Sequence, residues 1–225
     1  MKRITIFTLF LALSGIAFGL IAARADEKQP MPPAQTQKTM EAAAQPPQTL
    51  ANLIADYNAG SNLKERYIAY ARKADQEGYK KLAQLFRASA KSLDIHLLFQ
   101  ANNISGLGGT PKADIKGVMV KSTQENLAAA IRSEAGDTEM TYPGYLDQAK
   151  SDNLKMPTIA FTSGSKIEVN RKDLLLEAQK DLKSWKKSAK NGFYVCTICG
   201  NLTANLNFKT CAVCGASVSQ FEQVK

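Results

Sequence analysis

The sequence predicts a mainly α-helical protein, in which a four-helix bundle is followed by a small β domain with a four-cysteine metal site. Three observations support this fold class. Apolar residues recur at intervals of three and four over much of residues 50–185, the period of helices with one buried face. All four cysteines lie in two Cys-x-x-Cys-Gly motifs near the carboxyl end. The 225 residues are 44% hydrophobic and 22% charged, which excludes a wholly disordered chain and a multi-span membrane protein.

The amino terminus has the three-part pattern of an export signal. Lys2 and Arg3 precede the uncharged apolar run 4–23, and small residues at positions 23 and 25 mark a cleavage site after Ala25. We therefore expect residues 1–25 to be a signal peptide, and the mature protein to be exported to the periplasm without membrane attachment. An uncleaved anchor is the alternative, because about 20 apolar residues can span a bilayer.

Residues 26–48 are expected to be a flexible linker. Five prolines stand there among Gln, Ala and Lys. This composition cannot form a packed core.

The first half of the bundle, which we assign to residues 49–188, is predicted to be a helical pair. One helix is expected over Leu50–Gly78, ending at a glycine, and the next over residues 79–103. Gly106, Gly108, Gly109 and Pro111 interrupt the pattern within residues 104–121. A connection of this length fits a crossover between distant helices better than a tight hairpin.

The second half of the bundle is predicted to be two further helices. Ser122 or Thr123 can cap a third helix, which is expected to bend near Tyr142-Pro143. Pro157 can open a fourth helix that continues to Trp185. Four helices with one long central connection are typical of the ferritin-like bundle, in which metals lie between facing helices.

The charged and titratable residues exclude several function classes. The chain has 29 Lys and Arg against 20 Asp and Glu, but the basic residues are spread among acids, so we expect no nucleic-acid partner. His96 is the only histidine in the sequence, which excludes most histidine-dependent catalysis.

The two cysteine motifs predict a four-thiolate metal site in a domain of residues 189–225. Cys196 and Cys199 form the first motif, and Cys211 and Cys214 form the second. Each motif directs two sulfur atoms at one point, and the glycine after it permits the tight turn. Iron and zinc both accept tetrahedral sulfur ligation. Two disulfides are the alternative in an oxidising compartment. Neither motif is followed by His, which excludes covalent c-type haem.

Several motifs, in this order, resemble the rubrerythrin family over about residues 49–225. They are Ala59-Gly60-Ser61-Asn62, Lys73-Ala74-Asp75-Gln76-Glu77-Gly78-Tyr79, Ile95-His96, Thr123-Gln124-Glu125-Asn126-Leu127, Tyr142-Pro143, and the ending from Tyr194 through Cys214 to Phe221-Glu222. The resemblance implies a ferritin-like bundle followed by a rubredoxin-like domain with one iron held by four thiolates. For typical members it also implies a di-iron centre that reduces peroxide and a dimer of bundles.

The di-iron ligands that the resemblance implies are largely replaced. The glutamate of the first helix falls on Gly60, and the Glu-x-x-His motif of the second helix has Leu93 in place of its glutamate. The fourth helix has Glu168 and then Arg171 in place of the histidine. A guanidinium cannot bind a metal, but it can pair with carboxylates. We therefore hypothesise that Arg171 pairs with Glu168 or Glu134 inside the bundle.

Four residues remain as candidate ligands of a residual bundle site: His96, Glu134, Asp137 and Glu168. Two metal ions are hard to hold with these side chains, so a di-iron centre is doubtful. The alternatives are a hydrogen-bonded core histidine and solvated acids on helix faces.

Two functions follow from these observations. The first is an exported rubrerythrin-like redox protein, in which iron at the four thiolates transfers one electron to or from an unidentified redox partner protein, with a link to peroxide reduction. The second is a non-enzymatic metal-binding scaffold with a structural zinc ribbon and an inactive di-iron site. Because the bundle ligands are replaced, the sequence leaves open whether the chain is a peroxidase-type oxidoreductase.

Overall fold

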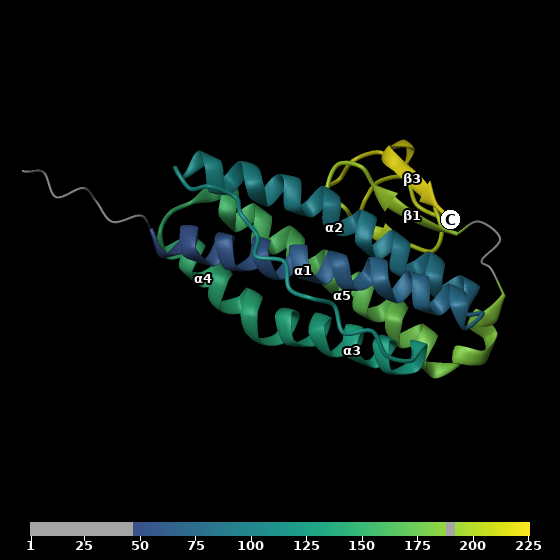
Figure 1. Ribbon diagram of the computed structural model, residues 1–225. Helices are drawn as coiled ribbons and strands as arrows, with labels where there is room; N and C mark the ends of the chain where they lie inside the picture. Colours follow the sequence, from purple (N-terminus) through teal and green to yellow (C-terminus); the bar gives the residue numbers. More distant parts are fainter. Residues whose placement is uncertain (1–46, 188–191) are drawn as a thin grey trace, which may run out of the picture. The chain divides into compact units, whose positions relative to one another are not determined.

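The computed structural model describes residues 47–187 and 192–225, and five α-helices account for most of them (Figure 1). The helices are α1 (Gln48–Gln76), α2 (Lys80–Gly106), α3 (Thr123–Gly136), α4 (Tyr142–Ser151) and α5 (Lys155–Lys180). Together α3 and α4 form the third rod of the predicted four-helix bundle. The expected signal peptide and nearly all of the expected linker lie outside the described residues, as does the boundary expected between residues 188 and 189. Among the residues that the structure describes, no helix is long and apolar enough to cross a membrane.

Helices α1 and α2 form an antiparallel hairpin. The turn between them contains Gly78, whose φ of +80° lies in the left-handed region where a side chain is costly. The amide of Tyr79 then donates to the carbonyl of Ala74 at 2.8 Å, so the turn is closed by backbone hydrogen bonds. The glycine stop predicted from the sequence is confirmed at this turn.

The long connection between α2 and α3 runs back along α1 (Figure 1). Two asparagines of α1 hold its backbone: Asn58 Oδ1 accepts from the amide of Asp114 at 2.8 Å, and Asn62 Oδ1 accepts from the amide of Lys116 at 2.7 Å. Helix α3 then begins with the predicted cap, because the Ser122 side chain and the Glu125 side chain each accept from the other's backbone amide. These contacts satisfy the backbone of a crossover that has no regular structure of its own.

The bend expected near Pro143 begins earlier than predicted. Residues Asp137–Thr141 form a turn of π-helix, η1, and α4 starts at Tyr142. The amide of Tyr142 donates to the carbonyl of Asp137, five residues back. Pro143 has no amide to donate, so the regular hydrogen-bond pattern is interrupted where the chain enters α4.

The bounds predicted for the fourth helix were wrong at both ends. Helix α5 starts at Lys155, so Pro157 lies within its first turn rather than opening it. The helix ends at Lys180 because Asp181 has extended backbone angles, and its side chain accepts from Ser184 at the start of a short 3-10 helix, η2 (Leu182–Lys186). Trp185 is therefore buried from η2 and not from α5.

The carboxyl-terminal residues form a small antiparallel sheet with the strand order β2-β1-β3. The strands are β1 (Phe193–Cys196), β2 (Leu202–Thr203) and β3 (Phe221–Val224). Cys196 pairs with Phe221, and Val195 pairs with both Leu202 and Glu222. The central strand therefore carries the first metal-site cysteine at its end.

The sheet and the helices share one hydrophobic core. The buried side chains of Phe193, Val195 and Leu202 belong to the same cluster as Phe86 and Leu175 of the bundle. Trp185 stacks on Phe193 with ring centroids 6.2 Å apart. This continuous packing places the cysteine site against the bundle of its own chain.

Candidate metal centre and the buried bundle centre

Two loops of the same geometry present the four cysteines. In the first loop, the amide of Gly200 donates to the carbonyl of Cys196 at 2.8 Å; in the second, the amide of Gly215 donates to the carbonyl of Cys211 at 2.9 Å. Both glycines have positive φ, +85° and +75°. The glycine after each motif is therefore required by the turn, as the sequence predicts.

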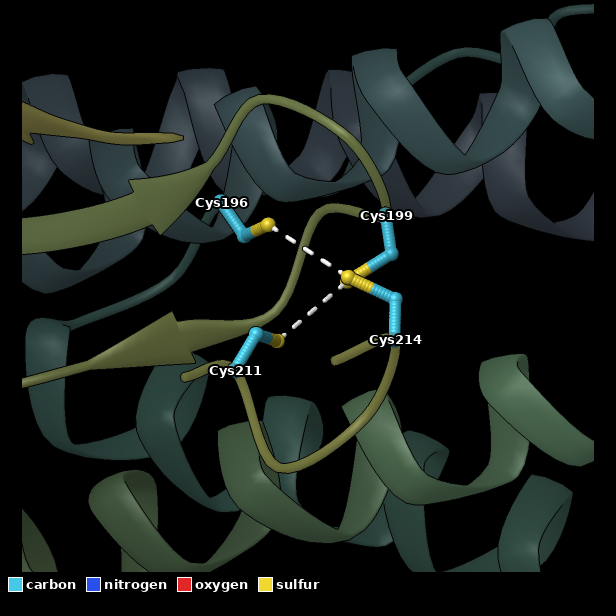
Figure 2. A group of neighbouring side chains, drawn as sticks. All are labelled: Cys196, Cys199, Cys211 and Cys214. Carbon is cyan, nitrogen blue, oxygen red and sulfur yellow. Dashed lines mark hydrogen bonds between the residues drawn. The ribbon is translucent and has the colours of Figure 1, made fainter. Parts of the chain in front are cut away.

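The four sulfur atoms converge as the ligands of one tetrahedral ion would (Figure 2). All lie within 4.8 Å of one another, with Cys196 and Cys214 3.8 Å apart and Cys199 and Cys211 3.7 Å apart. A metal–sulfur bond of about 2.3 Å gives tetrahedron edges of about 3.8 Å. All four cysteines are free, so the structure forms neither of the alternative disulfides. The donor set and spacing thus fit iron or zinc.

Backbone amides surround the sulfurs and favour their ionised form. Burial raises the pKa of the Cys199 and Cys214 thiols, and it opposes ionisation of Cys211 as well. Hydrogen bonds from the amides of Val213 and Cys214 outweigh burial at Cys211 and lower its pKa. The amide of Asn201 donates to Cys199 in the same way. Such N–H donors stabilise thiolates bound to a metal.

The cysteine site has one open side. Cys196 and Cys211 are buried, Cys199 is half-buried and Cys214 is exposed. Phe208 packs edge-on against Phe221, the strand partner of Cys196, with ring centroids 5.2 Å apart. The site therefore meets solvent on the Cys214 side, while Cys196 and Cys211 are shielded from water.

The centre of the bundle contains a protein cation. The Arg171 guanidinium is 1% exposed and donates through Nε and Nη2 to both carboxylate oxygens of Glu134, at 2.9 and 3.0 Å. Nη2 also lies 3.3 Å from Glu168 Oε1. The hypothesis that Arg171 pairs with Glu134 or Glu168 is confirmed, since it contacts both. Despite burial, the two carboxylates raise the pKa of Arg171 further above its usual value, so the residue stays charged.

The four candidate ligands of a residual bundle site are not gathered around one point. Glu134 and Glu168 face Arg171, Asp137 lies half-buried on η1, and His96 makes no ion pair with any of them. Within residues 47–187 and 192–225, the cysteines form the one group of three or more potential ligands close enough to share an ion. A bundle metal site remains a prediction from the sequence. A guanidinium at its centre does not fit a di-iron cofactor, because it repels metal cations and occupies the carboxylates.

His96 is a neutral core histidine in this structure. Burial, together with the nearby Arg171 charge, lowers its pKa to about 3. Its Nε2 has no hydrogen-bond partner in the part of the chain that the structure describes, and it lies 3.0 Å from the position that a Cβ at Gly164 would take. Any side chain at position 164 would collide with His96 and with the Tyr142 hydroxyl, so glycine is required inside α5.

Sequence reasoning missed two polar residues that extend this centre together with the buried Tyr142: Gln100, which is buried, and Asp56, which is half-buried by accessible surface. Tyr142 donates to Glu168 Oε1 at 3.2 Å and also approaches Asp56, while Gln100 Nε2 donates to Asp56. Burial, with help from the Asp137 charge, raises the pKa of Asp56 to about 7. A signal existed in the helical spacing, because Asp56 lies one turn before Gly60 and Gln100 lies one turn after His96.

Glu134 has a second partner that the sequence did not reveal. The Tyr67 hydroxyl donates to Glu134 Oε1, and both residues are fully buried. Burial also raises the pKa of Glu168 well above its usual value, and the neighbouring Glu134 charge acts in the same direction. At the centre, Arg171 therefore pairs with Glu134 and Glu168, and the Tyr67 and Tyr142 hydroxyls donate to these two carboxyl groups.

The first cysteine loop is in direct contact with the helices. Ser92 Oγ of α2 donates to the carbonyl of Gly200 at 2.6 Å, and Asn170 of α5 donates to the Asn201 side chain at 2.6 Å. A Cβ on Gly200 would lie 2.5 Å from the Ser92 carbonyl oxygen. The loop can approach α2 this closely only because the residue is glycine.

The fold and the site define a helical bundle with a rubredoxin-like four-cysteine domain, and comparison with known proteins agrees. No family model matches the chain. Rubrerythrin-2 of Clostridium acetobutylicum is 27% identical over 172 residues, which cover 76% of this chain and 93% of that protein. The structure of fully reduced, all-ferrous nigerythrin superposes with a TM-score of 0.73 at 24% identity, covering 78% of this chain and 86% of that one.

A bacterioferritin of Desulfovibrio desulfuricans superposes with a TM-score of 0.57 at 17% identity and covers 61% of this chain and 81% of that one. The predicted fold class, a ferritin-like bundle followed by a small cysteine-containing strand region, is thus confirmed. The chain is a rubrerythrin-like protein, as its sequence motifs predict.

Proposed function

We propose that this chain is an exported one-electron redox protein whose working centre is a rubredoxin-type iron. The observation that carries the proposal is the four-sulfur site: its sulfur spacing fits a tetrahedral ion, and amide hydrogen bonds reach Cys199 and Cys211. Iron bound there would alternate between the ferric and ferrous states. The exposed Cys214 side provides the approach for a redox partner protein.

The relatives support iron rather than zinc as the resident metal. The nigerythrin structure is described as all ferrous. Its superposition covers 78% of this chain, a length that the bundle alone does not reach. The alternative is a structural zinc ribbon on a non-enzymatic scaffold. It is supported by the replacement of the bundle ligands, which removes the usual recipient of the electron.

Metal content and colour of the purified mature protein test the proposal. We expect one iron per chain and a red ferric spectrum that dithionite bleaches. One zinc and a colourless protein would establish the scaffold instead. The amino-terminal residue of the protein recovered from the periplasm tests export, with Asp26 expected after cleavage at Ala25.

We further propose that the bundle centre binds no metal in the native protein and therefore does not reduce peroxide. Gly60 and Leu93 occupy the places of two family carboxylates and lie side by side, because a Cβ at Gly60 would be 3.7 Å from Leu93 Cδ2. With Arg171 paired to Glu134 and Glu168, the site has lost ligands and gained a cation. Two or three irons per chain in the native protein would overturn this part of the proposal.

A gain-of-ligand variant tests the same point from the other direction. The triple substitution Gly60→Glu, Leu93→Glu and Arg171→His restores the family pattern at three positions. We expect it to bind iron beyond the four-thiolate ion, with Arg171→His alone as the control. A folded triple variant that binds no additional iron would show that the guanidinium is not what excludes metal.

A further inference from the structure

Ser92 links the cysteine site to the ion pair inside the bundle. Its side chain is fully buried on α2. The Oγ accepts a hydrogen bond from Arg171 Nη1 at 3.3 Å and donates one to the carbonyl of Gly200 at 2.6 Å. One hydroxyl therefore contacts both the bundle cation and the glycine that directly follows Cys199.

The chain of hydrogen bonds continues to a sulfur ligand. The carbonyl of Gly200 and the amide of Asn201 belong to the same peptide unit, and that amide donates to the Cys199 sulfur. Donation to a peptide carbonyl polarises the unit and strengthens the hydrogen bond that its amide makes. The sequence of donors runs in one direction, from guanidinium to hydroxyl to peptide to sulfur.

The loop is held in the position that this path needs. Gly200 lies against the backbone of α2, with no space for a Cβ, and Asn170 binds Asn201 at 2.6 Å. The shared hydrophobic core surrounds the contact. In such a low-dielectric interior, oriented donors act more strongly on a nearby charge than they do in water.

We propose that Arg171 acts through Ser92 and the Gly200–Asn201 peptide to stabilise negative charge on Cys199, and thereby favours the reduced state of the four-thiolate iron. Reduction adds one electron from a donor protein or, in the test, from an electrode, changes ferric to ferrous iron, and makes or breaks no bond. Ser92 is a positioning residue in this scheme. The inference rests on the proposed function only where iron is concerned.

A double-mutant cycle on the iron protein measures the coupling. We expect Ser92→Ala to lower the equilibrium constant for reduction about tenfold, near 59 mV for one electron, since a hydrogen bond to a charged system is lost. In a background with Arg171→Gln and Glu134→Gln, the same change should cost about threefold or less. Equal effects in the two backgrounds, or no effect in either, would overturn the proposal.

Two matched variants separate the path from general packing. Ser89 is buried one turn earlier on α2, and its hydroxyl has no partner among the described residues, so Ser89→Ala should leave the potential unchanged. Asn170→Ala removes the other contact with the loop but not the path. If Asn170→Ala depended on the Arg171 background as strongly as Ser92→Ala does, docking alone would explain the result and the path would be rejected.

The zinc-loaded protein provides a readout that needs no redox activity. In its NMR spectrum, we expect Ser92→Ala to move the Asn201 amide proton upfield as its bond to Cys199 weakens. The amides of Val213 and Ala216, which donate to other sulfurs, should not move. If the Asn201 amide proton shifts but the native protein contains only zinc, the hydrogen-bond path is supported and the redox function is refuted. If the Asn201 amide proton does not shift but the native protein contains reducible iron, the path is refuted and the redox function is supported.

Discussion

Replacing Arg171 with glutamine should destabilise the protein far more than the loss of a surface charge does. The substitution leaves Glu134, which is 0% exposed, without its cation. Breaking a buried pair by removing one partner costs about 3–5 kcal/mol, because an uncompensated charge stays in the core. That is a large part of the roughly 5–15 kcal/mol by which native domains are stable.

Urea unfolding of the zinc-loaded protein at pH 7, followed by circular dichroism, measures this loss. Adding Glu134→Gln to Arg171→Gln should recover most of it, since a pair of neutral amides needs no counter-charge. The surface pair Lys64–Asp94, at 3.0 Å and with side chains 28% and 53% exposed, supplies the control. Lys64→Gln should cost less than about 1 kcal/mol.

Two results would refute the reasoning. Arg171→Gln could prove as mild as Lys64→Gln, in which case the guanidinium does not balance a buried charge. Alternatively, the double variant could be as unstable as Arg171→Gln alone. The loss would then arise from packing around the long side chain, and not from the charge left on Glu134.

Two further predictions concern Asp56 and the glycines of the two cysteine loops. The pKa of Asp56 is raised from 3.8 to about 7 in the native state, so between these values the folded protein holds a proton that the unfolded chain releases. The unfolding free energy should therefore fall as pH rises from about 4 to 7, by up to about 4 kcal/mol, and then level off. In urea titrations, Asp56→Asn should flatten this part of the pH profile. An unchanged slope would contradict the raised pKa of Asp56. Gly200 and Gly215 both have positive φ, but a Cβ on Gly215 would meet open space whereas one on Gly200 would meet Ser92. Gly215→Ala should lower the unfolding free energy by about 1–2 kcal/mol. Gly200→Ala should lower it more and expose the first cysteine loop to proteolysis. Equal losses of unfolding free energy would show that the loop does not pack on α2.

Local sequence signals predicted the elements that depend on local chemistry. The Ser122 capping box, the Gly78 stop and the two cysteine loops are each set by a few neighbouring residues, and all three are confirmed. The period of apolar residues likewise predicted the long helices. The rubrerythrin resemblance supplied what periodicity alone could not, which is the identity of the bundle positions that face the centre.

Features set by tertiary packing were predicted less well. The π-helical turn at Asp137–Thr141 replaces a bend expected at Pro143. The fourth helix ends at Lys180 because the chain turns there and buries Trp185 against Phe193 instead. Each difference depends on a contact with another element, which the local pattern does not contain.

The polar residues of the interior were the hardest to identify. Ser92 and Asp56 are common residue types on a helix, and nothing in their immediate neighbours indicates that Ser92 is fully buried and Asp56 half-buried. Their importance arises from partners that are distant in sequence. Ser92 contacts Arg171 and Gly200, and Asp56 contacts Gln100 and Tyr142. Replacement of family ligands was visible in the sequence, but the network that took their place was not.

The substitutions at the bundle centre make sense only as a set. A di-iron site needs several carboxylates to offset two cations. Removing the metals alone would leave those carboxylates as buried, unpaired charge, whereas introducing Arg171 beside a full ligand set would still leave an excess of anions. By the rubrerythrin resemblance, Gly60 and Leu93 stand at two carboxylate positions, Arg171 supplies one cation for Glu134, and burial raises the pKa of Glu168. The Arg171 guanidinium thus offsets buried carboxylate charge without metal, and it also donates to Ser92, which contacts the first cysteine loop.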